Sequence, residues 1–219
     1  MTANLVSLTD PTSPAAEAYR RLRVNLASAA RDVQHQTLLI ASAGDSEEKA
    51  SVVANLAVTF ARAGKRVILV DCDLRHPAQH TLFGLVNEVG VTTACNGGPA
   101  GLPLQATEVP GLRVLTSGPA VPVPSDLIAS PAMAVLMERL CSEADVVLFD
   151  APPVMLATDA VELATLVDAV LLTVSAGNTK RDDAQRAKDV LSKAGARLVG
   201  AVLINVPVNL AQHKYLSTS

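Results

Sequence analysis

The segment from Thr37 to Ala57 constrains this chain most, because it combines an apolar strand, a tight loop and the start of a helix. The strand is marked by the apolar run Leu-Leu-Ile-Ala, and the helix by apolar residues that recur at helical spacing. Small residues between them let backbone N–H groups converge on an anion, and the helix N-terminus adds the positive end of its dipole. The segment is therefore predicted to be a phosphate-binding loop.

The loop departs from the usual phosphate-loop pattern, in which two glycines with four residues between them precede a lysine and a serine or threonine. Gly44 and Lys49 stand where the first glycine and the lysine are expected, with one residue fewer between them. Ser51, further on, is a candidate nucleotide contact. Glu48 precedes the lysine, where a glycine is needed, and Ala50 follows it, where a hydroxyl should hold Mg²⁺. The loop is therefore predicted to bind a nucleotide poorly.

Composition places the chain in a broad class. Its 219 residues, 49% of them hydrophobic, suit one α/β domain with a full core. A net charge of -3 provides no basic surface, so no nucleic-acid partner is expected. Three widely spaced cysteines favour reduced thiols in a cytosolic protein, and the absence of a long apolar run favours a soluble chain.

Two apolar runs end in carboxylates. VILVDCD carries Asp71 and Asp73, and VVLFD ends in Asp150 with the shape of a Walker B element, whose carboxylate holds a magnesium-bound water. Open parallel sheets bind ligands at the carboxyl ends of their strands, so these acids are candidate site residues. Taken without the neighbouring phosphate loop, Asp71 and Asp73 are equally well explained as solubilising acids at a strand end. They can share one side of the sheet only if the strand ends before Asp73.

Beyond Asp150 the chain alternates between helix and strand: helix 159–166, strand 169–174, helix 181–194 and strand 198–205. Apolar strands separated by helices predict a doubly wound, mainly parallel α/β sheet with helices on both faces. Residues 84–111 are rich in glycine, proline and small side chains, and we expect an irregular connection around one short helix there.

An amphipathic helix is predicted over residues 13–30, because its apolar residues recur at helical spacing. Glu17, Arg20 and Arg23 fall on one polar stripe of this helix. By themselves, such residues indicate a solvated helix face with local ion pairs.

Seven segments, EAYRRLR, GKRVILVDCDLRHP, GLRVLTSG, DLIAS, VVLFDAPPV, TDAVELA and VLIN, follow one another over about 190 positions. Together they resemble the bacterial tyrosine kinase (BY-kinase) family, the cytoplasmic partners of membrane polysaccharide co-polymerases and a branch of the MinD/ParA deviant-Walker group. The resemblance implies a P-loop NTPase-like domain over residues 37–219. It also implies an N-terminal segment over residues 1–36 with an oligomerisation helix, the whole forming one compact domain.

The resemblance implies a role for each candidate site residue, with Mg-ATP as the cofactor. Asp71 and Asp73 would be catalytic Walker A′ acids, one of them the base for the tyrosine hydroxyl. Asp71 and Asp150 would lie at Mg²⁺, Lys49 would bind phosphate, and Asn205 would face the adenine.

The resemblance also implies partners. Glu17, Arg20 and Arg23 match the family's E-x-x-R-x-x-R stripe, which joins protomers into a ring. A membrane co-polymerase-like adaptor would hold the chain at the inner face of the membrane, so a cytoplasmic, peripheral location is expected.

Several residues differ from the family pattern at positions that the family uses for its chemistry. Ser46 and Glu48 replace glycines of the loop, and Ala50 replaces a serine. The C-terminal tyrosine cluster is reduced to Tyr215, and residues 121–124 read Val-Pro-Val-Pro where the family has Pro-Pro-Asn-Pro. The Walker A loop is therefore interpreted as degenerate.

Three functions follow from these observations. The sequence favours a pseudokinase that acts in polysaccharide biosynthesis through assembly, with weak or absent nucleotide binding. The alternative is a slow but active ATP-dependent tyrosine kinase or ATPase, and the third is a MinD/ParA-like positioning ATPase. In a site without nucleotide, we expect Glu48 or Glu47 to lie at or beside the β-phosphate position as the counter-charge of Lys49.

Overall fold

The computed structural model describes residues 5–29, 36–44, 48–98 and 101–206. Its strands are β1 (Gln36–Ser42), β2 (Val67–Asp71), β3 (Gln105–Ala106), β4 (Leu112–Leu115), β5 (Val146–Asp150), β6 (Ala169–Ser175) and β7 (Leu198–Ile204). Its helices are α1 (Val6–Thr9), α2 (Pro14–Ala29), α3 (Lys49–Arg62), α4 (Gln79–Phe83), α5 (Val91–Cys95), α6 (Pro124–Ile128), α7 (Pro131–Glu143), α8 (Asp159–Ala164) and α9 (Arg181–Lys193). No helix within these ranges is long and apolar enough to cross a bilayer.

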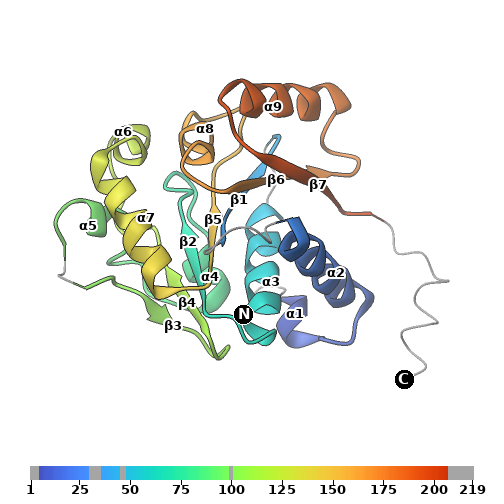
Figure 1. Ribbon diagram of the computed structural model, residues 1–219, viewed down its shortest axis with the longest axis horizontal. Coiled ribbons are helices and arrows are strands. Elements are labelled where there is room, and N and C mark those ends of the chain that lie inside the picture. Colours follow the sequence, from blue (N-terminus) through green and yellow to red (C-terminus); the bar gives the residue numbers. More distant parts are fainter. Residues whose placement is uncertain (1–4, 30–35, 45–47, 99–100, 207–219) are drawn as a thin grey trace.

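The strands form one sheet between two layers of helices (Figure 1). Their order in the described chain is β3-β4-β2-β5-β1-β6-β7. All neighbouring pairs are parallel except β3 and β4, which are antiparallel. The predicted doubly wound, mainly parallel sheet is therefore confirmed.

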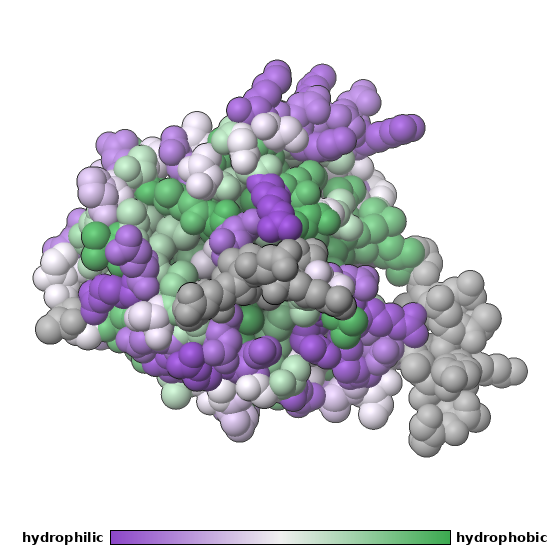
Figure 2. Space-filling view, in the orientation of Figure 1, coloured by the Kyte–Doolittle hydropathy of each residue, from purple (hydrophilic) through white to green (hydrophobic). Residues whose placement is uncertain are grey.

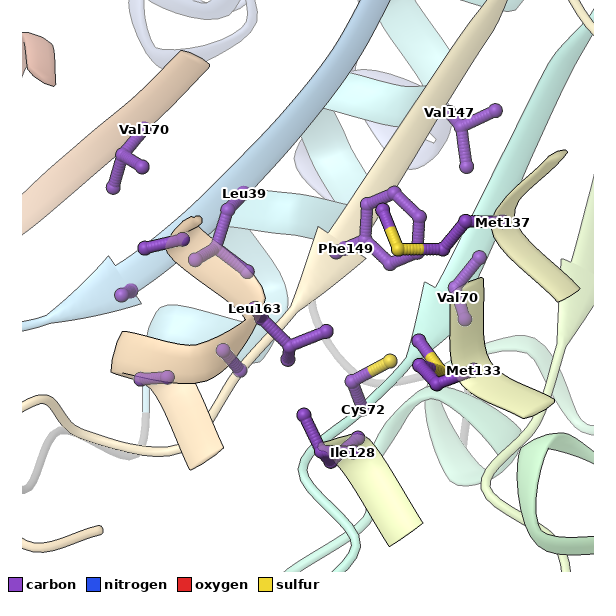
Figure 3. Packing of buried hydrophobic residues seen from close by; sticks show 14 of the residues in the cluster. Leu39, Val70, Cys72, Ile128, Met133, Met137, Val147, Phe149, Leu163 and Val170 are labelled. Carbon is purple, nitrogen blue, oxygen red and sulfur yellow. The ribbon is translucent and has the colours of Figure 1, made fainter. Parts of the chain in front are cut away.

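The two faces of the sheet carry separate hydrophobic cores, because successive side chains of a strand point to opposite sides. In β1, Leu38 and Ile40 pack in a cluster with α3 and with Leu26 of α2. Leu39, on the opposite face, belongs to a second cluster with residues of α6, α7 and α8. Figure 3 shows side chains of this second cluster, among them Phe149 of β5. A slip of one residue would exchange the two faces, so burial on both sides specifies the register of the strands.

Two parts of the fold differ from the sequence interpretation. β7 was expected to be covered on both faces, but Ala201 and Leu203 are exposed because the strand lies at the edge of the sheet. Next to this edge, the outer face of α9 is hydrophilic (Figure 2). The connection over residues 84–111 contains the expected short helix, α5, and also β3, whose two residues form no pattern that the sequence could reveal.

The arrangement of the central strands determines where a site can form. β5 lies between β1 and β2, and all three are parallel, so their carboxyl ends meet at one edge. The predicted phosphate loop follows β1, and Asp71 of β2 lies opposite Asp150 of β5. The fold therefore places the loop beside the acids that the sequence singled out.

Candidate functional site

Four charged side chains meet at this edge of the sheet. Asp71 and Asp150 end β2 and β5, Asp73 lies two residues beyond β2, and Lys49 is the first residue of α3. All four are buried, with 4% of Lys49 and 1% of Asp150 exposed. Because β2 ends at Asp71, the backbone turns before Asp73 and both acids reach the same site. The structure thus brings together four residues predicted from separate motifs.

Lys49 is held by two acids at the carboxyl ends of neighbouring strands. Its Nζ forms an ion pair with Oδ1 of Asp150 and lies 3.4 Å from Oδ2 of Asp73. Burial by itself lowers the pKa of Lys49, but the negative charges of Asp150 and Asp73 outweigh it and raise the pKa. The lysine is therefore charged, and its charge is compensated inside the protein.

Asp71 has one oxygen engaged and one without a partner. Its Oδ2 accepts hydrogen bonds from the backbone N–H groups of Ala78, at 3.0 Å, and Gln79, at 2.9 Å. Its Oδ1 is buried and has no hydrogen-bond partner in the described chain. Burial and the charge of Asp150 raise the pKa of Asp71 to about 8, against the opposing effects of the two backbone hydrogen bonds and Lys49. An unpartnered carboxylate oxygen fits a hard cation such as Mg²⁺.

Gln79 is a site residue that the sequence analysis missed. It is fully buried, and its Nε2 donates to Oδ2 of Asp150, at 2.7 Å, and to the backbone oxygen of Ala50, at 3.1 Å. With Lys49 on the other oxygen, both oxygens of Asp150 are engaged. No motif marks this glutamine, because its role depends on how α4 packs beside β5 and the start of α3.

The segment after β2 is fixed by a second set of contacts. The backbone N–H of His76 donates to Oδ1 of Asp73 at 3.1 Å. Arg75 forms two hydrogen bonds with Asp159, at 3.0 Å and 3.1 Å, and this aspartate is fully buried in the first turn of α8. A paired guanidinium and carboxylate give a defined geometry. The pair therefore ties the Asp73 segment to α8.

Glu48 and Asn205 contact each other beside the loop. Asn205 follows β7 with a φ of 58°, and its Nδ2 donates to Oε1 of Glu48, at 2.7 Å, and to Oγ of Ser175, at 3.0 Å. Asn205 thus lies near the start of α3, and its expected contact with the adenine stays a prediction. The expectation that Glu48 would be the counter-charge of Lys49 is wrong, since Asp150 and Asp73 have that role. Glu47 lies outside the described residues.

The remaining loop residues are placed as follows. Gly44 comes two residues after β1, and Ser51 is half-buried in the first turn of α3. Ala50 is buried between Lys49 and Ser51, so a methyl group occupies the position at which a hydroxyl would contact Mg²⁺. Ser46 lies outside the described residues.

The stripe on α2 contains local ion pairs. Arg20 Nε lies 2.7 Å from Glu17, and Arg21 Nε lies 3.4 Å from its other oxygen. The hydrogen bond from Arg20 lowers the pKa of Glu17. Arg23 has no ion pair within this group, although it lines the same small cavity as Arg20. The pairs fit the solvated-face interpretation and leave the ring interface a prediction.

The raised pKa of Asp71 predicts a pH dependence of stability. The folded protein keeps this proton up to about pH 8, whereas the unfolded chain releases it near pH 4. The stabilisation is therefore complete below pH 4 and is lost as the pH rises toward 8. Relative to Asp71→Asn, which keeps the shape but cannot titrate, the wild type should lose at least about 1 kcal/mol between pH 5 and pH 8. Urea unfolding in metal-free buffer measures this difference, and parallel pH profiles would contradict the assignment.

Comparison with known proteins agrees with this geometry. The CobQ/CobB/MinD/ParA nucleotide binding domain family matches residues 38–216. The tyrosine-protein kinase YwqD of Bacillus subtilis (strain 168) is 39% identical over 204 residues, which are 93% of this chain and 86% of the relative. The putative tyrosine-protein kinase CapB of Staphylococcus aureus is 34% identical over 200 residues, which are 91% of this chain and 88% of the relative.

A solved structure is similar over nearly the same extent. The crystal structure of the chimerical protein CapA2B2 has a TM-score of 0.88 and 36% identity, and the match covers 93% of this chain and 90% of that one. The buried lysine and acids at the carboxyl ends of parallel strands, the family match and these similarities lead to one conclusion. The chain belongs to the bacterial tyrosine kinase (BY-kinase) family, within the CobQ/CobB/MinD/ParA group of nucleotide-binding domains.

Proposed function

We propose that this chain is a BY-kinase-like pseudokinase, an assembly or regulatory component of capsular or exopolysaccharide biosynthesis in which nucleotide binding is weak or lost. One observation carries the proposal: Lys49 is buried against Asp150 and Asp73 while Glu48 stands beside it at the start of α3. A lysine that binds phosphate must first leave these acids. The carboxylate of Glu48 then opposes the incoming negative charge.

The size of the electrostatic repulsion supports a large loss of affinity for the nucleotide. A carboxylate about 5 Å from a phosphate charge costs roughly 3 kcal/mol at an effective dielectric constant near 20. Ala50 also removes the hydroxyl that would hold Mg²⁺. Since each 1.4 kcal/mol is a factor of ten, affinity should be at least about a hundredfold below that of a loop with the full pattern. The acids fit a cation, but the loop does not fit a triphosphate.

The second candidate is a slow but active ATP-dependent tyrosine kinase or ATPase. It is favoured by Asp71, Asp73 and Asp150, which lie buried together, and by the unpartnered Oδ1 of Asp71. In this proposal Asp71 and Asp73 are the catalytic acids and Asp71 and Asp150 hold the metal.

A MinD/ParA-like positioning ATPase is the third candidate, and the tyrosine kinases among the relatives make it the least favoured.

Restoring the loop tests the main proposal. The variant Ser46→Gly, Glu48→Gly, Ala50→Ser should bind ATP at least about a hundredfold more tightly than the wild type, because repulsion is removed and the Mg²⁺ hydroxyl returns. Titration calorimetry with ATP and ADP, with and without Mg²⁺, measures the gain. Adding Asp150→Asn should abolish its Mg²⁺-dependent part. If the wild type itself binds Mg-ATP at micromolar concentration or tighter, the slow enzyme replaces the pseudokinase.

We further propose that the chain forms a ring-like homo-oligomer through the α2 stripe. Glu17 of one protomer would pair with Arg20 and Arg23 of its neighbour, and the local Glu17–Arg20 pair would be shared or broken on assembly. The triple variant Glu17→Ala, Arg20→Ala, Arg23→Ala should then lower the mass measured by light scattering to that of a monomer.

A matched control is available on another helix. Asp182, Lys188 and Lys193 are exposed residues of α9 with the same balance of charge. Their triple alanine variant should assemble like the wild type. A wild type that is already monomeric, or equal masses for the two triple variants, would rule out the stripe as the interface.

The third proposal concerns location. We infer that a membrane co-polymerase-like adaptor binds the chain and places it at the cytoplasmic face of the membrane. Membership of the family and similarity to the chimerical protein CapA2B2 support this. Affinity capture from the native host should recover a protein with transmembrane helices, and recovery of soluble proteins alone would count against the adaptor.

A further inference from the structure

Gln79 contacts two of the three acids at the carboxyl edge of the sheet. Its backbone N–H donates to Oδ2 of Asp71 at 2.9 Å, and its side-chain Nε2 donates to Oδ2 of Asp150 at 2.7 Å. Gln79 is the first residue of α4, whereas the two acids end β2 and β5. One residue therefore holds an oxygen of each acid, on strands that come from distant parts of the chain.

The two acceptors of Nε2 fix the orientation of the Gln79 amide. Nε2 also donates to the backbone oxygen of Ala50 at 3.1 Å, so a reversed amide would set Oε1 against two other acceptor oxygens. In the observed orientation, Oε1 is buried and has no partner in the described chain. A buried acceptor without a donor is costly. Packing alone therefore does not explain a glutamine at this fully buried position.

Asp71 is the acid that this arrangement leaves open. Two backbone N–H groups hold its Oδ2, so the carboxylate has one orientation, in which Oδ1 has no partner in the described chain. No ion pair of the described residues includes Asp71, whereas Lys49 pairs with Asp150 and lies near Asp73. Asp71 therefore keeps one fixed oxygen for a ligand from outside the chain.

The kind of ligand follows from the chemistry of these atoms. Carboxylate oxygens suit Mg²⁺ and Mn²⁺, and Mg²⁺ is usually held by one or two carboxylates while it keeps several waters. This fits the site, because no group of three or more His, Cys, Asp or Glu side chains of the described residues is placed to hold a metal ion. The waters of such a cation would donate to acceptors around it.

Acceptors for these waters are present beside Asp71. The hydrogen bonds from Lys49 and Gln79 use about half of the acceptor positions of the Asp150 carboxylate, so it can still accept from a water. Oε1 of Gln79 is an unpartnered acceptor next to it. Residues that hydrogen-bond to metal-binding carboxylates orient them, and their loss typically lowers metal affinity about 10- to 100-fold. We propose that Gln79 is a positioning residue for a divalent cation at Asp71, and that this cation binds without a nucleotide.

This role rests on the same site as the proposed function, but it does not rest on the loop. The ATP affinities of the wild type and of the restored loop decide between a pseudokinase and a slow enzyme. Binding of a cation without nucleotide requires neither Glu48 nor Ala50 to change. Each proposal therefore succeeds or fails by its own measurement.

The test is a titration of the nucleotide-free full chain with Mn²⁺, in which the electron paramagnetic resonance signal of the free ion measures how much is bound. One Mn²⁺ per chain is expected to bind, and Mg²⁺ should displace it. Asp71→Asn should remove this binding, because the carboxylate is lost. A wild type without saturable Mn²⁺ binding, or binding that Asp71→Asn leaves unchanged, would overturn the proposal.

Substitutions of Gln79 then test the positioning role. Gln79→Met keeps the length of the side chain but cannot donate to Asp150, so the affinity for Mn²⁺ should fall at least about tenfold. Gln79→Asn keeps an amide but withdraws it from Asp150 by one carbon, and it should weaken binding several-fold. This second variant carries the test if the methionine variant does not fold.

Gln105→Met is the matched control. Gln105 also holds the backbone, since its Nε2 donates to the oxygen of Val86 at 2.8 Å and its Oε1 accepts from the N–H of the same residue at 3.2 Å. Its hydrogen-bond partners in the described chain include no acid. The control should therefore lower the melting temperature and leave the affinity for Mn²⁺ unchanged. Equal Mn²⁺ affinities for the Gln79 variants and Gln105→Met would refute the positioning role.

Discussion

The ion pair between Lys49 and Asp150 is the interaction on which the site depends. Removing charged groups from water is costly, and a buried pair is tolerated only when its remaining atoms are also satisfied. Here the second oxygen of Asp150 accepts a hydrogen bond from Gln79, and Lys49 also lies near Asp73. Removing the lysine would leave three acids buried together. The network is thus compensated without any nucleotide, and a triphosphate would have to compete with it.

The network exists because strands far apart in the sequence are neighbours in the sheet. Pairing of β2 with β5 sets Asp71 opposite Asp150, and the burial of Asp71 together with the charge of Asp150 raises the pKa of Asp71 to about 8. The contact of Arg75 with Asp159 extends this organisation to α8 on one face of the sheet.

Membership of the BY-kinase family explains the fold of this chain, but not the contacts within its candidate site. The family explains the sheet, the order of the motifs and the acids at its carboxyl edge. The site itself has Glu48 bound to Asn205 beside the loop and Gln79 bound to Asp150. Because these residues lie beside the loop, assembly rather than phosphoryl transfer is proposed as the maintained function.

The sequence by itself determined the α/β class, the parallel sheet and the candidates Lys49, Asp71, Asp73 and Asp150, because these depend on local periodicity and on motifs at strand ends. It also located α2 and the helices and strands after Asp150 to within two residues at each end. Only the tertiary structure decided which partners these side chains choose. Gln79 lies in no motif, and the counter-charge of Lys49 comes from residues 24 and 101 positions away rather than from the adjacent Glu48. Contacts between distant elements arise from packing and strand order, which local sequence patterns do not encode.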